Sequence, residues 1–544
     1  MSFGVTDRAS RLEQLASAEL DLLIVGGGIT GVAVARDAVM RGFSAACVER
    51  EDFAYGTSSR SSKLIHGGLR YLEQANFKLV FEGTRERATL RRVAAHLVRP
   101  IEFLVPVYES SKHGVMALGV GLWMYDQLAG KRRYKRHSRH NPEAIREREP
   151  TLRSEELRGG ATYYDCMTDD ARLCVENAMG AHERGAIMLN KVEFVSPHRN
   201  DEGRVTGALI RDRQTGKEHD VRCKVLVHCA GPWTDSVLSA MGDQTGMIRT
   251  SKGVHILFPH DVLPVKHAVV MAAVQDKRVV FCIPRGRVTL VGTTDTDFTG
   301  SPNEVHADSD DVDYLLATLA HYFPERPPTR ADIRATYAGL RPLVRDDSDS
   351  PYDVSREHTV VTRDDATVTI GGGKYTTYRR MASDVVVAAM KVMGIKRKDR
   401  PTCPTMDAPL PGATDFAVDA EDATDAIKAR IAAGVDEDIA RYVVQVYAAR
   451  HTAIETLGER LIPDFPYTSG MVDYAIFEEA ATSVADILVR RLPVFYEAPD
   501  QGLECAALVA DRLGEALGWD AERRAADVSA YAQVVADSRR WQNP

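Results

Sequence analysis

An apolar run of strand length, residues 21–25, lies near the start of the chain and is followed at once by a glycine-rich turn. The glycines have the spacing G-x-G-x-x-G, at Gly26, Gly28 and Gly31. Residues 32–38 fit a helix, so the motif stands between a strand and a helix, as a nucleotide-binding turn requires. Glycine allows the tight turn, the close approach of a pyrophosphate, and close packing of the helix on the strand.

A second apolar strand, residues 45–48, ends at Glu49, about 20 residues after the glycines, where a carboxylate can bond a ribose hydroxyl. The helix start at Ile29 and Thr30 offers free N–H groups and the positive end of the helix dipole to phosphates. Together these features predict a dinucleotide-binding site. A purely structural glycine turn would leave Glu49 without a role.

Small hydroxyl side chains are dense between residues 56 and 63, where the chain reads Gly-Thr-Ser-Ser-Arg-Ser-Ser-Lys. A flexible linker has a similar composition, but the immediate return to apolar residues and Gly67-Gly68 argues against one. We interpret the segment as a loop along the path of a bound cofactor. Its candidate contacts are Thr57, Ser58, Ser61, Ser62 and Lys63, although Arg60 stands where a small residue is expected.

Two later strands also end in glycine turns, at Gly231, which follows Ala230, and near Gly371. A nicotinamide domain is usually a contiguous block and would not need these distant turns. A large, extended cofactor touched by separate pieces of one sheet explains all three turns, and this spacing favours a flavin dinucleotide.

Composition limits the remaining classes of function. The 544 residues carry a formal net charge of −8, which argues against a nucleic-acid partner. None of the eight cysteines has C-x-x-C spacing, so we predict no metal site and no dithiol redox motif, but reduced thiols in a cytosolic compartment. Residues 1–20 lack the apolar core of a secretory signal, and no apolar run is long enough to span a bilayer.

Residues 115–125 are unusually apolar and include Trp123 and Tyr125. A basic cluster follows, made of Lys131, Arg132, Arg133, Lys135, Arg136 and Arg139. An apolar element beside a cationic patch is what contact with a membrane surface needs. A core helix followed by a solvated loop explains the pattern equally well, and both interpretations stay open here.

Several longer strings resemble the FAD-dependent glycerol-3-phosphate dehydrogenases. They are SSKLIHGGLRYLE at 61–73, GPW at 231–233, KGVH at 252–255, GTTD at 292–295, GLRPL at 339–343, DDSDSP at 346–351 and GGKYTTYR at 372–379. The resemblance extends from about residue 21 to residue 380. The Ala-, Glu- and Arg-rich part beyond Pro411 has helical periodicity and is more loosely similar to the family's cap domain.

The resemblance implies an α/β fold with a Rossmann-like FAD-binding domain, interleaved with a sheet-containing substrate domain, and an all-helical C-terminal cap domain. We expect 1–110 to begin the FAD-binding domain, with segments near 160–250 and 340–400 returning to it. Substrate segments are expected at 111–160 and 250–340, and the helical domain at 405–544. The sequence leaves the assembly open, with a homodimer as one candidate.

The implied reaction oxidises sn-glycerol 3-phosphate to dihydroxyacetone phosphate by hydride transfer to flavin N5, while a base removes the hydroxyl proton. Arginine suits a phosphate dianion because its planar fork contacts two oxygens. The resemblance places Arg70, Arg341 and Arg356 at the substrate, whereas Arg345 resembles a structural ion-pair residue. Electrons are expected to pass to a membrane quinone, which implies a cytoplasmic protein lying peripherally on the inner face of the cell membrane.

For the base we favour His255, because an imidazole titrates near neutral pH, with a satisfied core histidine as the alternative. Tyr71, Thr294 and Lys374 would hydrogen-bond substrate oxygens, or Lys374 would instead stabilise the reduced flavin. The residues that the resemblance adds to the cofactor site are Gly67, Ala230, Gly231, Gly373, Lys374 and Thr376.

Three rival functions stay open from the sequence. The first is a glycerol-3-phosphate oxidase that reduces oxygen with the same site chemistry, and the second is a non-catalytic flavin-binding sensor. The third is a glycine- or amino-acid-oxidising relative of the same fold, for which three arginines around one carboxylate are too many.

Overall fold

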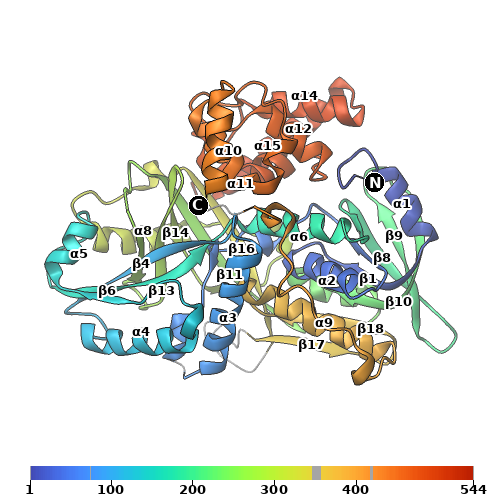
Figure 1. The fold of residues 1–544 in the computed structure, drawn as a ribbon, viewed down its shortest axis with the longest axis horizontal. Coiled ribbons are helices and arrows are strands. Elements are labelled where there is room, and N and C mark those ends of the chain that lie inside the picture. Colours follow the sequence, from blue (N-terminus) through green and yellow to red (C-terminus); the bar gives the residue numbers. More distant parts are fainter. Residues whose placement is uncertain (1, 74, 346–356, 417–420, 543–544) are drawn as a thin grey trace.

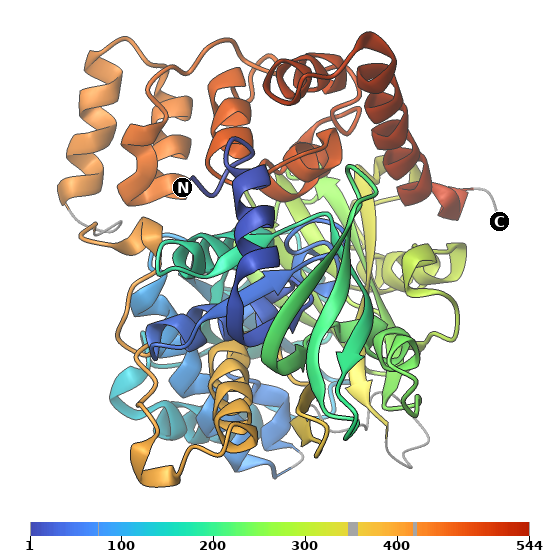
Figure 2. The same cartoon turned by 90° about the vertical axis from the view of Figure 1, so that its right-hand side faces the viewer.

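The computed structural model describes residues 2–73, 75–345, 357–416 and 421–542. Two β-sheets lie side by side, and the C-terminal helices form a layer along one side of both sheets (Figure 1). Figure 2 shows the same helices extending across the molecule above the sheets. The site described below lies where the two sheets meet.

The first sheet has eight strands in the described ranges, in the order β17-β18-β10-β1-β2-β7, with β9 and β8 continuing from β10. They are β1 (Glu19–Val25), β2 (Ala45–Val48), β7 (Ile187–Leu189), β8 (Val192–Arg199), β9 (Val205–Asp212), β10 (Glu218–His228), β17 (His358–Thr362) and β18 (Thr367–Gly372). β1 runs parallel to β2 and β10, β2 to β7, and β10 to β18. These parallel strands are apolar along most of their length because both faces are covered, one by helices and the other by β8 and β9 with an N-terminal helix.

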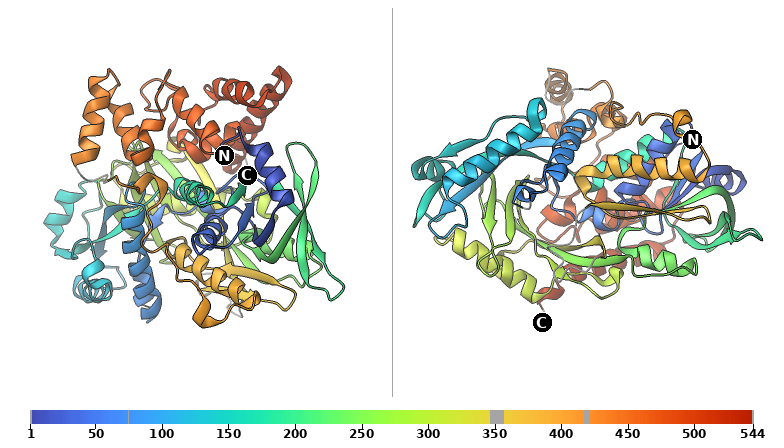
Figure 3. Two further views of the ribbon diagram at one scale, coloured as in Figure 1. Left: turned by 45° about the vertical axis from the view of Figure 1, so that its right-hand side comes forward. Right: turned by 90° about the horizontal axis from the view of Figure 1, so that it is seen from below.

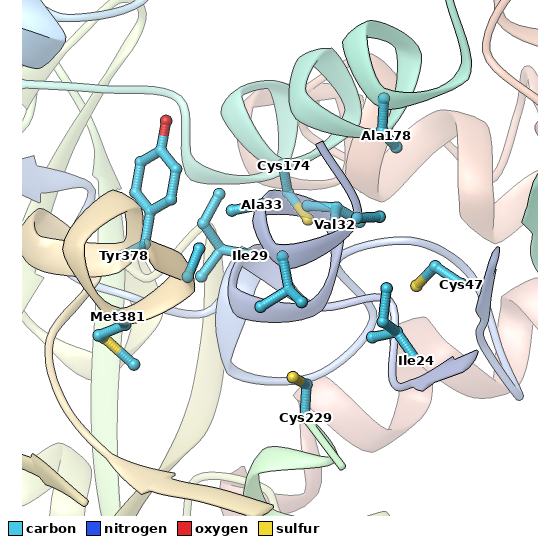
Figure 4. Close-up of a cluster of buried hydrophobic side chains, with 14 of the residues drawn as sticks. Ile24, Ile29, Val32, Ala33, Cys47, Cys174, Ala178, Cys229, Tyr378 and Met381 are labelled. Carbon is cyan, nitrogen blue, oxygen red and sulfur yellow. The ribbon is translucent and has the colours of Figure 1, made fainter. Parts of the chain in front are cut away.

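Helices α2 (Ile29–Met40), α6 (Asp170–His182) and α9 (Tyr378–Val392) pack around this parallel sheet. Figure 4 shows the core between them, where side chains of α2 lie beside α6 on one side and α9 on the other. The labelled members are Ile24, Ile29, Val32, Ala33, Cys47, Cys174, Ala178, Cys229, Tyr378 and Met381. The first βαβ unit and its glycine turn are thus anchored in a dry core. Helices α1 (Arg8–Ser17) and α7 (Thr234–Ala240) complete this half.

The second sheet has ten strands in the described ranges, mostly antiparallel. They are β3 (Leu64–Ile65), β4 (Arg99–Tyr108), β5 (Ser138–His140), β6 (Leu157–Met167), β11 (Ile248–Pro259), β12 (Ala268–Ala272), β13 (Val279–Arg285), β14 (Val288–Gly292), β15 (Thr296–Asp297) and β16 (Ala335–Val344). The long β11 pairs with both β14 and β16, which sets His255 opposite Gly292 on one side and Tyr337 on the other. Helices α3 (Phe77–Val93), α4 (Val115–Ala129), α5 (Pro142–Arg148) and α8 (Ser309–Tyr322) accompany this sheet.

The C-terminal part is helical, as predicted. Its helices are α10 (Glu421–Ala432), α11 (Glu437–Tyr447), α12 (Ser469–Phe477), a π-helix (Asp486–Arg491), α13 (Val494–Glu497), α14 (Ala506–Leu517) and α15 (Ala521–Ser538). Buried charges join it to the first sheet. Both Arg490 and Arg491 pair with the fully buried Asp52 in the loop after β2, at 2.7 and 2.9 Å. Each charge is compensated by hydrogen bonds, as burial requires.

The predicted fold class is confirmed: an α/β protein with two interleaved sheet regions and a helical C-terminal part. The segment 1–110, expected to begin the FAD-binding domain, contains β4 at its end, and β4 pairs with β6 in the second sheet. β16 belongs to that sheet as well. The predictions for Arg356 and for residues 346–351 concern a stretch outside the described residues.

Candidate active site

A cavity of about 1820 Å³ lies between the two sheets. Ordinary small-molecule pockets measure roughly 300–1,000 Å³, so this one has room for a dinucleotide and a substrate together. One end is formed by the carboxyl ends of the parallel strands β1, β2 and β10, and the other by loops and strands of the second sheet. This is where open α/β sheets bind their ligands.

The glycine turn after β1 leaves no space for side chains. A Cβ atom added at Gly31 would lie 1.8 Å from the carbonyl oxygen of Gly26, and Gly26 has a φ of +109°, which favours glycine. Helix α2 begins at Ile29; its N-cap, Gly28, has no side chain, and the Ile29 N–H is bonded by Ser58 of a neighbouring loop. Its first N–H groups thus lie beside the cavity, as a phosphate-binding turn requires.

Glu49 lies at the end of β2 against the same turn. Its carboxylate accepts hydrogen bonds from the Gly27 N–H at 2.6 Å and from the Glu51 N–H at 2.8 Å, and it lines the cavity. Burial raises the pKa of the Glu49 carboxyl, against the effect of these two N–H groups. The carboxylate is thereby fixed at the position from which a ribose hydroxyl can be bound.

The hydroxyl-rich loop divides its side chains between the cavity and internal bonds. Ser58 Oγ accepts the Ile29 N–H at 2.9 Å, and Thr57 Oγ1 donates to the Leu340 carbonyl at 2.6 Å. Ser61 Oγ donates to Asp170 at 2.7 Å, and the buried amine of Lys63 pairs with the same carboxylate at 2.5 Å. The loop therefore contacts both sheets, and Asp170 binds its middle through Ser61 and Lys63.

Cationic side chains line the cavity in two places, at Arg341 of β16 and around Tyr71. Arg341 hydrogen-bonds the Asp295 carboxylate at 3.1 Å, Thr293 Oγ1 at 3.1 Å and the Thr294 carbonyl at 3.0 Å. The Lys374 amine lies 3.6 Å from the centre of the Tyr71 ring, and the Arg70 guanidinium lies 5.2 Å from it. Burial lowers the pKa of Lys374, as does the charge of Arg70.

His255 also lines the cavity and is almost wholly buried. Its Nε2 lies 2.9 Å from Ser62 Oγ, and its ring stacks on Tyr337 with centroids 4.7 Å apart. Burial, followed by the positive charges of Arg341 and Lys63, holds the pKa of the His255 imidazole well below its usual value. The ring is therefore neutral at physiological pH and able to accept a proton.

Family comparisons agree with this arrangement. Residues 21–379 match the family described as FAD dependent oxidoreductase, and residues 403–524 match the C-terminal domain of alpha-glycerophosphate oxidase. The chain is 34% identical to the aerobic glycerol-3-phosphate dehydrogenase of Bacillus subtilis over 542 residues, covering 96% of each. It is 36% identical to the glycerol-3-phosphate dehydrogenase of Mycobacterium leprae over 546 residues, covering 98% of this chain and 92% of that one. The chain belongs to the FAD-dependent glycerol-3-phosphate dehydrogenase family.

A solved structure of this dehydrogenase family extends the comparison to the fold. The X-ray structure of the glycerol-3-phosphate dehydrogenase from Bacillus halodurans complexed with FAD matches with a TM-score of 0.81 and 27% identity, covering 98% of both chains. The predicted family and the predicted cofactor, FAD, are both confirmed. The glycine turn, the fixed Glu49 carboxylate and the size of the cavity fit that cofactor.

Most of the residues expected from the dehydrogenase motifs line the cavity. They are Gly26, Gly28, Ile29, Thr30, Glu49, Thr57, Ser58, Ser61, Ser62, Arg70, Tyr71, Ala230, Gly231, His255, Arg341, Gly373, Lys374 and Thr376. Gly31, Lys63, Gly67 and Thr294 stand behind its wall. Gly67 donates its N–H to Asp165, and Thr294 Oγ1 accepts the Val254 N–H at 3.0 Å. The roles of all these residues stay predictions.

The structure also brings residues to the dehydrogenase cavity that the motif analysis did not select. Thr293 and Asp295 line it and bond Arg341, on either side of the expected Thr294. Alternation of side chains in an extended segment could have predicted this, because residues 293 and 295 face the same way. His66 lines it as well, and burial lowers the pKa of this imidazole to about 4.

Proposed function

We propose that this protein oxidises sn-glycerol 3-phosphate to dihydroxyacetone phosphate with FAD and passes the electrons to a membrane quinone. The observation that carries the proposal is the composition of the lining of one cavity. A dinucleotide turn, the cations Arg70, Arg341 and Lys374, and the neutral His255 all line it. The names of the Bacillus subtilis and Mycobacterium leprae relatives support the same substrate.

The cationic end suits a small phosphorylated alcohol. Arg341 presents a guanidinium held on three sides by Asp295, Thr293 and the Thr294 carbonyl, so its orientation is fixed before a ligand arrives. A guanidinium held in place contributes its positive charge to the cavity with little further loss of side-chain entropy when an anion binds. The Lys374 amine above Tyr71 supplies a second positive charge to the cavity lining.

When bound, FAD supplies the two-electron chemistry and accepts the hydride from C2 of the substrate. The chain orients the alcohol and takes up its proton. His255 serves this role because its imidazole is neutral, and because the stacked Tyr337 ring and the Ser62 hydroxyl fix its plane. Deep burial excludes bulk water from this histidine, which keeps the proton transfer within the site.

The depressed pKa of His255 predicts an unusual pH dependence. An unperturbed histidine base loses activity as the pH falls through its ordinary pKa of about 6.5. His255 stays neutral below that point, because burial and the cations Arg341 and Lys63, whose own partners are Asp295 and Asp170, disfavour the imidazolium. The rate of cofactor reduction in anaerobic stopped flow should stay level from about pH 8 down to about pH 6. An acid limb centred near 6.5 would contradict this assignment.

Anaerobic titration of the FAD-loaded protein with sn-glycerol 3-phosphate tests the proposed function. We expect the visible flavin absorbance to bleach at stoichiometric substrate. Glycerol lacks the phosphate and should bleach it only at far higher concentration, and glycine tests the amino-acid-oxidase alternative. A spectrum that does not change with sn-glycerol 3-phosphate would indicate a flavin-binding sensor and would reject the proposal.

The proposed quinone acceptor is supported by a group of apolar side chains in the lining of the cavity. Side chains of β4, β12, β13 and α4 line it, including Phe103, Val105, Val270, Phe281 and Leu118. A lipid-soluble quinone needs an apolar path of this kind, whereas molecular oxygen does not. Reoxidation of the reduced protein by a short-chain quinone should therefore outpace reoxidation by dissolved oxygen. Rapid oxygen consumption by lipid-free protein would favour the oxidase alternative.

The outer face of α4 supports a peripheral position on the inner face of the cell membrane. Met116, Val120 and Trp123 form an exposed apolar stripe on α4, which packs against α3, where Phe77 and Phe81 are also exposed. Figure 3 shows the two helices side by side in the view from below. In contrast, Leu122 and Tyr125 of the same helix are buried, so α4 is both a core helix and an exposed surface.

Basic residues flank this stripe. Lys131, Lys135, Arg136 and Arg139 are exposed at the end of α4 and after it, and Arg132 lies 4.9 Å from the centre of the Phe81 ring. Apolar side chains rimmed by cations are what a peripheral protein presents to an anionic leaflet. None of the helices within the described ranges has the length and apolar character needed to cross a bilayer.

Reversing the charge of Arg132 and Arg133 to glutamate should weaken binding to anionic vesicles. Each basic residue near such a surface contributes about 1 kcal/mol, so the double variant should bind at least 30-fold more weakly in a sedimentation assay. The same reversal at Arg397 and Lys398, two exposed residues that follow α9, is the matched control and should leave sedimentation unchanged. Equal effects of the two double variants would remove the membrane argument.

A further inference from the structure

The hydroxyl of Ser62 stands between the cavity and the imidazole of His255. Ser62 is only partly buried and lines the cavity, whereas 3% of His255 is exposed. Nε2 of His255 lies 2.9 Å from Ser62 Oγ, and its Nδ1 is buried with no hydrogen-bond partner within the described part of the chain. We infer that Ser62 is a catalytic residue that relays the substrate's hydroxyl proton to His255. The inference rests on the proposed function.

The surroundings of the ring leave few other routes for a proton. Tyr337 covers one face of His255, with an angle of 19° between the ring planes. On the neighbouring strand, a Cβ atom at Gly292 would lie 2.3 Å from Cδ2 of the imidazole, so the backbone of β14 closes that edge. Of the two ring nitrogens, Nε2 alone is bonded within the described residues, and its partner is Ser62.

A serine bonded to a histidine is also the arrangement of a nucleophile and its base, and the structure argues against that role. In such triads a carboxylate accepts the Nδ1–H and fixes the tautomer and orientation of the ring. No carboxylate contacts Nδ1 of His255 among the described residues. Neither tautomer is therefore imposed by the protein, and the ring can accept a proton at Nε2 from Ser62.

The relay moves two protons, and one hydride leaves the substrate with them. The O–H bond of the substrate breaks and its proton forms a new bond to Ser62 Oγ, while the original Ser62 proton moves to Nε2 of His255. The C2–H bond breaks and its electron pair leaves with the hydrogen to the flavin of FAD. The alcohol becomes a ketone, Ser62 is regenerated, and His255 carries one positive charge. Arg341 and Lys63 favour loss of that proton, so the base returns to its neutral form after product leaves.

Tyr337 is a positioning residue for both members of the pair. Its ring stacks on His255, and its hydroxyl donates to the Ser61 carbonyl at 2.8 Å, directly before Ser62. The C-terminal helix α13 supports it, because the edge of Tyr496 lies against Tyr337 with ring centroids 5.5 Å apart. The Tyr337 side chain thus fixes the distance between Ser62 Oγ and Nε2 of His255.

The test compares Ser62→Ala with Ser62→Thr in the FAD-loaded protein. Loss of the relay should slow cofactor reduction by about 100-fold in anaerobic stopped flow, and threonine should restore most of the rate because it keeps a hydroxyl. FAD affinity, measured by flavin fluorescence on titrating the apoprotein, should change by less than about threefold in both variants. The alanine variant should also gain a rate that rises with pH, because hydroxide replaces the missing relay.

Two outcomes would overturn the relay: a wild-type reduction rate in Ser62→Ala, or a loss of FAD affinity that accounts for the slower rate. If the Ser62 variants do not fold, the relay is tested on the wild-type protein by its solvent isotope effect. If two protons move in the same step, the rate of cofactor reduction depends on the deuterium fraction of the solvent along a curve. A linear dependence would reject the relay. Wild-type protein that sn-glycerol 3-phosphate does not reduce at all would instead reject the proposed function.

Discussion

Replacing Arg341 by alanine is expected to lower kcat/KM for sn-glycerol 3-phosphate by about 100- to 1000-fold, corresponding to 3–4 kcal/mol, while FAD stays bound. The guanidinium lines the substrate end of the cavity, only 24% of its side chain is exposed, and it has a fixed orientation. Removing the guanidinium takes away a fixed positive charge that water cannot fully replace for a bound phosphate. Steady-state kinetics and the flavin absorbance of the purified variant provide the two measurements.

The matched control is Arg345→Ala, four residues further along the chain, where the side chain is exposed. It should leave kcat/KM within about twofold, as surface charges usually do. Truncating Arg341 also leaves the Asp295 carboxylate without this partner, which could itself disturb the site. Recovery of activity on adding Asp295→Asn to Arg341→Ala would assign the loss to that carboxylate and contradict a direct phosphate contact.

The nucleotide end of the site could be predicted from the sequence because its parts are local. The strand, the glycine turn and the start of α2 lie within about 20 residues, and Glu49 follows on the adjacent strand. Within this turn a Cβ atom at Gly31 would meet the carbonyl of Gly26, only five residues earlier. Periodicity and spacing carry this information directly.

The substrate end could be predicted only through the family resemblance, because its contacts join distant segments. The sequence predicts that Lys63 contacts the cofactor, whereas in the fold its amine lies 2.5 Å from the Asp170 carboxylate. In the sequence His255 is an isolated histidine. The pairing of β11 with β16 is what places Tyr337 against its ring. No local pattern specifies such pairings, since they depend on strand register.

The link between the C-terminal helices and the cofactor loop was also beyond the sequence analysis. Asp52 stands three residues after Glu49 and accepts hydrogen bonds from both Arg490 and Arg491. Arginine is common on solvated helices, so these two residues gave no signal of burial in a charged, helical segment. The fold shows that the C-terminal part holds the loop next to the Glu49 carboxylate.

Gly31→Ala should weaken FAD binding by about 10- to 100-fold, because overpacking costs about 1–3 kcal/mol. The new Cβ would lie 1.8 Å from the Gly26 carbonyl oxygen and 3.3 Å from Cβ of Cys229. The backbone cannot rotate away as a flexible side chain could, so α2 must move from β1 and carry its N-terminal N–H groups off the pyrophosphate. Titration of the apoprotein with FAD, followed by flavin fluorescence, measures the loss.

Gly114→Ala is the matched control, because among the described residues no atom beyond its two chain neighbours lies within 4 Å of the added Cβ, and φ at this residue is −74°. It should bind FAD as the wild type does. Far-UV circular dichroism separates the two ways in which Gly31→Ala could fail, since a displaced helix keeps the helical signal and an unfolded sheet does not. Wild-type affinity in Gly31→Ala would mean that α2 can shift without cost, and that the close contact between the turn and the helix does not set the cofactor's place.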